Sequence, residues 1–311
     1  MPDNNPTMKN SDPALLQVNG YQPKSWLAEQ ARWYCDQLER GHVLFFPTVP
    51  FDLPQSDREF LLSQKQAESR FHKNISFRPS RDLLKGVAAD SPDRERLLGI
   101  MRHFSKETAG FVDSFLAPYA GKCKMDFASF RPLEEHSRDL PLHKRNDLLH
   151  VDAFPTRPTR GGRILRVFVN INAEASRIWN VGEPFHVFVP KLAQSEKLSP
   201  PYRGALARSL VHLASGMGLP FADRSRYDEF MLYFHDWLKE NGNFQQNSSK
   251  QELALLPGWT WLVYTDGVPH AVMSGKFALE QTFIVPPEAL VTPQVAPVRV
   301  LEQVTGTAMV S

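Results

Sequence analysis

Apolar and polar residues change spacing several times along the chain. A polar, Pro- and Asn-rich stretch over residues 1–24 predicts a loose tail. Helical spacing then predicts a helix through residues 25–41, with Ser25 as its N-cap. The short apolar run HVLFFPTV (42–49) predicts a strand. From residue 56 to about 119, apolar residues recur at three- and four-residue steps, which predicts mostly helix.

The spacing becomes strand-like after residue 126. We predict strands at DFASFRP, LLHVDAF, RILRVFVNI and EPFHVFVP before residue 191, and at GWTWLVYT, HAVMSG and ALEQTFIVP after residue 257. Helical spacing returns from about 199 to 240, and residues 241–250 read as a polar loop. The last fifteen residues carry no clear pattern.

This order predicts an α+β fold in one domain over residues 25–311. Its parts would be mostly helical support (25–125), a β-rich core (126–190 and 251–290) and a helical insert (191–250). The elements do not alternate as in βαβ units, and the sequence has no G-x-G-x-x-G or Walker loop.

Composition narrows the class of protein. The 311 residues are 42% hydrophobic and 23% charged, which excludes wholesale disorder. Thirty-six Lys and Arg against 34 Asp and Glu are too balanced for a dedicated nucleic-acid binder. Two cysteines exclude a disulfide scaffold and a thiolate-based zinc site. The absence of a signal peptide and of a long apolar run predicts a cytoplasmic protein.

His150, Asp152 and His270 are the candidate metal ligands. Residues i and i+2 of a strand point to the same face, so His150 and Asp152 can reach one ion together. His270 ends another strand-like run, PGWTWLVYTDGVPHAV. Two imidazoles and one carboxylate leave other positions of the ion open, as non-heme Fe(II) sites require for O2 and a cosubstrate. The alternative is that His150 is only a hydrogen-bonded strand residue.

Arginines on the strand RILRVFVNIN are candidate anchors for a dicarboxylate, because a guanidinium binds a carboxylate through two hydrogen bonds. Arg166, Phe168 and Asn170 share one face and Arg163 points to the other. Either Arg166 faces the interior and pairs with an anion, or this is an edge strand whose arginines are solvated.

Basic residues gather around the H-x-D motif, with four acidic residues among them. They indicate either an anionic substrate at the mouth of the site or a solvated face of mixed charge. They are Arg131, Arg138, Lys144, Arg145, Arg157, Arg160 and Arg163.

Other chemistries have weaker support. Serine hydrolysis lacks a G-x-S-x-G nucleophile elbow. Cys35 lies in an amphipathic helix, where packing is the more common role of a cysteine. Paired glycosidase carboxylates are left open, but no sequence feature marks such a pair.

The block LHVDAFPTRPTRGGRILRVFVNIN followed by RIWNVGEPF resembles the 3-deoxy-D-manno-oct-2-ulosonic acid (Kdo) hydroxylases, and so do HKNISF and SFRP upstream. The likeness extends over roughly residues 70–285. The resemblance implies a double-stranded β-helix (jelly-roll or cupin-like) core with N-terminal helices and a helical insert. It also implies a catalytic domain that uses Fe(II), 2-oxoglutarate and O2.

By this resemblance, the reaction would hydroxylate C3 of Kdo in lipid A-linked inner core and release succinate and CO2. His150, Asp152 and His270 would hold the iron. The segment after the distal histidine, GKFALEQTF, lacks the Arg or Lys that many related dioxygenases place there. Arg166 is therefore the first candidate for binding 2-oxoglutarate, and Arg131 is the second, with Arg163 and Asn170 nearby.

Kdo-lipid A is an anionic glycolipid, so we expect basic and polar residues to face it. The expected set is Lys73, Asn74, Arg138, Arg145, Arg157, Arg160 and Trp179, of which Trp179 could equally be a core residue. Such a substrate also implies peripheral contact with the inner face of the inner membrane. Two alternatives remain: the same chemistry on another sugar acid or a protein side chain, or a non-catalytic cupin-like protein that binds metal or sugar.

Overall fold

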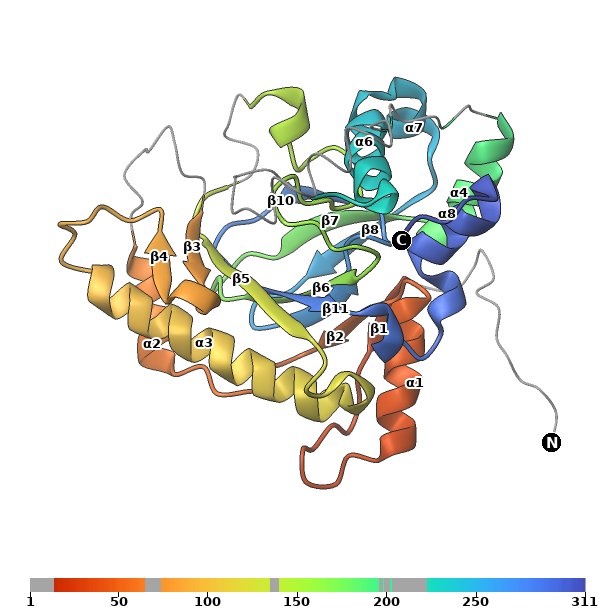
Figure 1. Ribbon diagram of the computed structural model, residues 1–311. Coiled ribbons are helices and arrows are strands. Elements are labelled where there is room, and N and C mark those ends of the chain that lie inside the picture. Colours follow the sequence, from red (N-terminus) through yellow and green to blue (C-terminus); the bar gives the residue numbers. More distant parts are fainter. Residues whose placement is uncertain are drawn as a thin grey trace.

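The computed structural model describes residues 14–64, 74–134, 140–195, 198, 202 and 223–310, and these form a mixed α+β structure (Figure 1). The helices are α1 (Ala28–Glu39), α2 (Gln55–Ser63), α3 (Arg94–Phe115), α4 (Phe185–Ser195), α6 (Arg226–Glu240), α7 (Gly242–Asn247) and α8 (Pro297–Thr305). The strands are β1 (Leu15–Gln17), β2 (Val43–Phe46), β3 (Ile75–Arg78), β4 (Leu83–Lys85), β5 (Lys124–Arg131), β6 (Arg163–Asn170), β7 (Arg177–Gly182), β8 (Lys250–Leu255), β9 (Thr260–Tyr264), β10 (His270–Ser274) and β11 (Ala278–Val285). The α+β prediction is confirmed. No helix in this part of the chain is long and apolar enough to cross a bilayer.

Two sheets organise the fold. The large sheet has the order β1-β2-β9-β6-β11-β5-β3-β4, and the small sheet has the order β10-β7-β8. Strand β6 lies between β9 and β11 and pairs antiparallel with both. The alternative of an edge strand for RILRVFVNIN is therefore ruled out, because both edges of β6 carry a neighbour.

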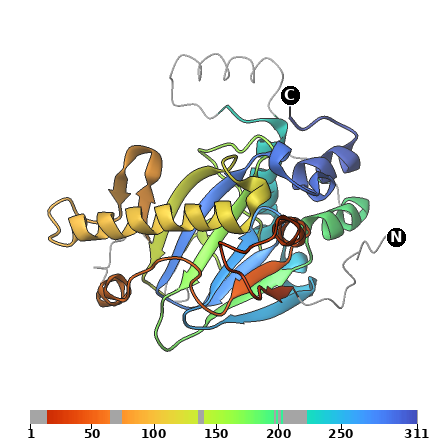
Figure 2. The same ribbon diagram turned by 90° about the horizontal axis from the view of Figure 1, so that it is seen from below.

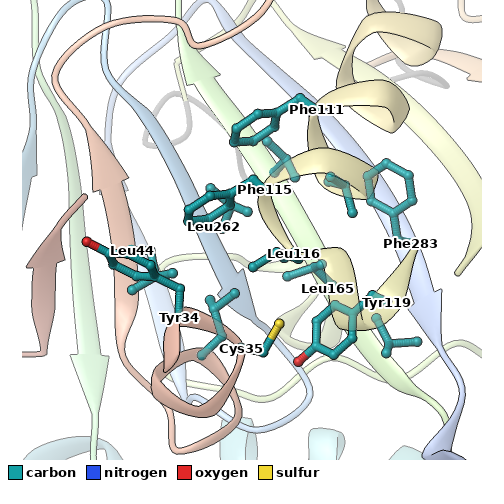
Figure 3. Packing of buried hydrophobic residues seen from close by; sticks show 14 of the residues in the cluster. Tyr34, Cys35, Leu44, Phe111, Phe115, Leu116, Tyr119, Leu165, Leu262 and Phe283 are labelled. Carbon is teal, nitrogen blue, oxygen red and sulfur yellow. The ribbon is translucent and has the colours of Figure 1, made fainter. Parts of the chain in front are cut away.

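The outer face of the large sheet is covered by α1 and α3. Figure 2 shows α3 crossing the strands. Phe111 and Phe115 of α3 and Cys35 of α1 pack with sheet residues such as Leu165 and Leu262 (Figure 3). Cys35 is fully buried, and burial raises the pKa of its thiol far above its usual value. A neutral, inaccessible thiol confirms the packing role predicted for Cys35.

The inner face of the large sheet packs on the small sheet over only part of its width. Phe168 of β6 and Trp261 of β9 meet Trp179 of β7 and Leu253 of β8 in a buried cluster. Phe168 stacks on Trp261 with ring centroids 5.1 Å apart. The members of this cluster that come from the large sheet lie on β2, β9 and β6. The inner face of β11, β5 and β3 lies outside this contact.

The segment EPFHVFVP, predicted as a strand, forms the start of α4 instead. Phe185, Phe188 and Val189 follow one another at helical steps and pack on Phe234 of α6 and Val300 of α8. A short apolar run fits both periods, and here the neighbouring helices decide the outcome. His186 therefore lies in a helix.

Several boundaries also differ from the predictions. Helix α1 begins at Ala28 with Leu27 as N-cap, where the side chain of Gln30 accepts a hydrogen bond from the Leu27 amide. The predicted polar loop at 241–250 contains α7, which Asn241 caps by accepting from the amide of Phe244. Strands β3 and β4 interrupt the helical stretch 56–119, and α8 lies in the unassigned last fifteen residues.

Candidate metal centre

The three candidate ligands come from two segments that pair directly. His150 and Asp152 lie outside regular strands, and His270 is the first residue of β10. The amide of His150 donates to the carbonyl of His270 at 3.1 Å, and the amide of His270 donates back at 2.9 Å. The amide of Asp152 donates to the carbonyl of Thr265 at 2.8 Å. The predicted strand LLHVDAF is thus reduced to an isolated bridge that still brings the three side chains together.

The ligand atoms converge. One atom from each of His150, Asp152 and His270 lies within 4.8 Å of the others. The Nδ1–H of His150 donates to the carbonyl of Leu148 at 2.7 Å, and that of His270 donates to the carbonyl of Val268 at 3.0 Å. These bonds leave each Nε2 unprotonated, 3.9–4.0 Å from an oxygen of Asp152.

The charge states suit a cation. Burial lowers the pKa of both His150 and His270, so both rings are neutral and keep a lone pair at neutral pH. Burial alone would raise the pKa of Asp152, but Arg166, His270 and His150 hold that pKa far below its usual range. Two neutral imidazoles and one ionised carboxylate form the donor set of non-heme Fe(II) sites, so these residues fit a divalent ion.

Two of the predicted anchors meet beside Asp152 at a single buried glutamate. The Nη2 of Arg166 lies 2.9 Å from Oδ2 of Asp152, while its Nη1 donates to Glu280. Arg131 donates to the other oxygen of Glu280 from Nε at 2.8 Å and from Nη2 at 2.5 Å. Burial would raise the pKa of Glu280, but Arg131 and Arg166 lower it. Arg166 therefore faces inward and pairs with anions, as predicted, and the partners are protein carboxylates.

The ligand segment, residues 148–152, is held by two side chains of the helical insert. The sequence did not indicate these contacts. The side-chain amide of Gln245 accepts from the amide of Leu149 at 2.9 Å and donates to the Leu149 carbonyl at 2.8 Å. His235 donates from Nδ1 to the carbonyl of Val151 at 2.7 Å, and its ring centroid lies 5.0 Å from that of His150. These side chains form hydrogen bonds with the backbone of the ligand segment, as a neighbouring strand would.

Comparison with known proteins agrees with this geometry. The sequence model of the 3-deoxy-D-manno-oct-2-ulosonic acid (Kdo) hydroxylases matches residues 22–308. The chain belongs to the Kdo hydroxylase family. A search of curated proteins found no match.

Solved structures of a family member superimpose on the chain. A crystal structure of the Kdo hydroxylase KdoO, a non-heme Fe(II) alphaketoglutarate dependent dioxygenase, in complex with cobalt(II), is 36% identical. The match covers 96% of this chain and 98% of KdoO, with a TM-score of 0.84. KdoO complexes with alphaketoglutarate and Fe(III) and with succinate and Fe(III) match at TM-scores of 0.81 and 0.82, each 36% identical. They cover 95–96% of this chain and 97–98% of KdoO.

Three residues predicted near the cosubstrate or substrate have other roles. Arg163 lies on the opposite face of β6 from Arg166 and pairs in the interior with Asp266. Asn170 donates to the carbonyls of Ala175 and Leu255, which fixes the end of β6. Trp179 is 1% exposed and stacks on His270, so it supports a ligand ring instead of lining a mouth.

The remaining predicted substrate residues are scattered. Arg157 lies over the rings of Phe127 and Phe154 and pairs with Asp126. Arg145 pairs with Asp147, and Arg160 pairs with Asp223. Asn74 directly precedes β3 and is half-buried. Lys73 and Arg138 lie outside the described residues.

Replacing Gln245 with leucine should weaken metal binding by about 10- to 100-fold, because its hydrogen bonds to the ligand segment hold the metal ligands in position. The substitution removes both hydrogen bonds to Leu149, the residue before His150. Titration with Co(II), followed by visible absorbance, measures the affinity. Asn247→Ala is the control, because Asn247 lies in the same helix and its side chain donates to the side chain of exposed Asn243. Equal Co(II) affinities for the two variants would contradict this role.

Proposed function

We propose that the protein is an Fe(II)/2-oxoglutarate-dependent dioxygenase that hydroxylates C3 of Kdo in lipid A-linked inner core. The observation that carries this proposal is the buried set of two imidazoles and one carboxylate beside paired guanidiniums, in a chain of the Kdo hydroxylase family. KdoO, which is solved with Fe(III) and alphaketoglutarate, supports the cofactor assignment.

The metal ligands, the arginines and the aromatic residues of the site have separate roles in this reaction. His150, Asp152 and His270 hold the iron, which together with 2-oxoglutarate supplies the oxidation by O2 and yields succinate and CO2. Arg131 and Arg166 bind the far carboxylate of 2-oxoglutarate. Their two positive charges face the single negative charge of Glu280, which leaves one charge for a cosubstrate carboxylate once Asp152 binds the metal. Trp179 and Phe168 keep water from the opposite side of the site.

The two sheets constitute the double-stranded β-helix in this proposal, within a single catalytic domain over residues 25–311. Their contact over β2, β9 and β6 closes one side of the core, and the metal centre lies where β10 meets the ligand segment. The inner face of β11, β5 and β3 is then the side from which the substrate enters. Arg157 places a guanidinium on this side, over the rings of Phe127 and Phe154, where it can bind the carboxylate of Kdo.

A glycolipid substrate requires the enzyme to reach a membrane surface. We place the protein in the cytoplasm, in peripheral contact with the inner membrane through exposed basic residues such as Arg145 and Arg160. Sedimentation with vesicles that contain anionic lipid tests this contact. Binding should weaken as salt rises, and equal binding to neutral vesicles would contradict it.

Anaerobic reconstitution with Fe(II), followed by 2-oxoglutarate, O2 and Kdo-lipid A, tests the reaction. We expect succinate and a gain of one oxygen on the Kdo unit, in equal amounts. Succinate without the mass gain would support dioxygenase activity and exclude Kdo as the substrate. Neither product, with iron verified as bound, would favour a non-catalytic metal- or sugar-binding protein.

A further inference from the structure

Arg78 lies on the inner face of the large sheet, on the side that the small sheet leaves uncovered. Ile75 and Phe77 of β3 are buried against α3 on the outer face. Because side chains alternate along a strand, Ser76 and Arg78 point to the inner face. Phe77 pairs with Ala128 of β5, so Arg78 lies next to Phe127.

A bulge in β5 turns Phe127 toward Arg78. Gln281 of β11 pairs with Ala128 of β5, and Phe283 pairs with Met125. Strand β5 therefore advances by three residues where β11 advances by two, which is a β-bulge. The extra residue directs Asp126 and Phe127 to the inner face, while Met125 and Ala128 pack on the outer face. The Phe127 ring consequently lies between two arginines.

Guanidinium groups and aromatic rings alternate from the metal centre toward β3. The Arg166 guanidinium lies 5.8 Å from the centre of the Phe154 ring, and that of Arg157 lies 4.1 Å from it. Arg157 is also 3.9 Å from the centre of Phe127, and Arg78 is 4.7 Å from the same ring. These contacts fix the three guanidiniums in a row without neutralising them.

The three arginines differ in their acidic partners. Arg166 pairs with Asp152 and Glu280, and Arg157 pairs with Asp126. Arg78 has no ion pair with any residue that the structure describes, and its Nε is buried without a hydrogen-bond partner there. A buried guanidinium nitrogen without an acceptor is costly, which indicates a ligand that supplies one.

The position of Arg78 sets the size of that ligand. Strands β6, β11, β5 and β3 are consecutive in the sheet, so Arg78 is three strand spacings from Arg166, or about 14 Å at about 4.8 Å each. This span exceeds one sugar ring. We infer that Arg78 binds a second anionic group of the substrate, a carboxylate or phosphate on a unit next to the hydroxylated Kdo.

This inference rests on the proposed function and makes Arg78 a specificity residue. The enzyme would then select a Kdo unit that is attached to a further anionic unit over an isolated Kdo. The two sources of the second group are the carboxylate of a neighbouring sugar acid and a phosphate of the lipid A backbone. Both offer oxygen acceptors to the same guanidinium.

The test compares Arg78→Gln with wild type on Kdo-lipid A that carries two linked Kdo units, and on a simple Kdo glycoside that carries one carboxylate. We expect the variant to lose roughly 10- to 100-fold in kcat/KM on Kdo-lipid A, mainly through KM, because a charged hydrogen bond is lost. It should match wild type on the glycoside. Arg78→Lys should recover part of the loss. Arg81→Gln, in the exposed turn after β3, is the control and should behave as wild type.

Dephosphorylated Kdo-lipid A identifies the second group. If the loss disappears with this substrate, Arg78 binds a phosphate, and if it persists, Arg78 binds a neighbouring carboxylate. An equal loss on the glycoside and on Kdo-lipid A, or no loss on either, would overturn the inference. Failure of wild type to hydroxylate any Kdo substrate would instead overturn the proposed function.

Discussion

Replacing Asp152 with alanine should abolish both metal binding and turnover. The only carboxylate of the ligand set is lost, and Arg166 loses a partner at 2.9 Å and adds an uncompensated positive charge beside the ion. We expect succinate formation to fall at least about a thousand-fold, which corresponds to about 4 kcal/mol of lost transition-state stabilisation. Iron content after reconstitution and the rate of succinate formation should fall together.

Asp147→Ala is the matched control for Asp152. Asp147 lies in the same segment, pairs with Arg145 at the surface and is not part of the converging ligand group. This control variant should keep its iron and its activity. If Asp152→Ala bound iron as tightly as Asp147→Ala, the assignment of Asp152 as a ligand would be wrong.

Replacing Arg163 with methionine should destabilise the protein by about 3–5 kcal/mol, measured as the free energy of unfolding in urea. Arg163 and Asp266 are each 1% exposed, and the Nε of Arg163 lies 2.9 Å from Oδ2 of Asp266. The variant leaves a buried carboxylate with no opposite charge. A further Asp266→Asn substitution should recover much of the loss. Arg102→Met, which breaks an exposed pair with Asp82, should cost at most about 1 kcal/mol.

The loss in Arg163→Met should shrink as the pH falls. Burial raises the pKa of Asp266 in the folded protein, and Arg163 opposes that rise, so the pKa in the variant lies higher still. A carboxyl whose folded-state pKa exceeds its unfolded value binds more protons when folded, so it favours folding at low pH and loses that contribution as the pH rises through the folded-state pKa. A loss that is the same at pH 5 and pH 7 would contradict this account.

Strand periodicity in the sequence indicated His150 and Asp152 as ligands of one ion and left open whether Arg166 faces the interior. The i, i+2 rule placed His150 with Asp152, and the same rule separated Arg166 from Arg163. Glu280 was visible in GKFALEQTF, but its contact with Arg131 depends on the register of β11 against β5. Pairing register between distant segments is not encoded in local spacing, so that ion-pair network could not be predicted.

Helices α4 and α7 were harder to predict for a related reason. EPFHVFVP and the run around Gln245 are short, and a short run carries too few residues to separate a helix from a strand or a loop. The conformation of α4 depends on α6 and α8, which lie far away from it in the sequence. Gln245 has no signature as a residue that supports ligands, because its role arises only when α7 packs beside Leu149.

The bridge between His150 and His270 also constrains the order in which the molecule is made. These residues are 270 − 150 = 120 positions apart, and Gln245 and His235 lie between them. Contacts of such long range form late, because a large loop must close and lose conformational entropy before these contacts can stabilise the chain. A chain emerging from the ribosome therefore carries two of its ligands, His150 and Asp152, long before the third is synthesised. We therefore expect metal capture at the end of folding, after the insert has returned to the sheet, and do not expect the ion to nucleate the fold.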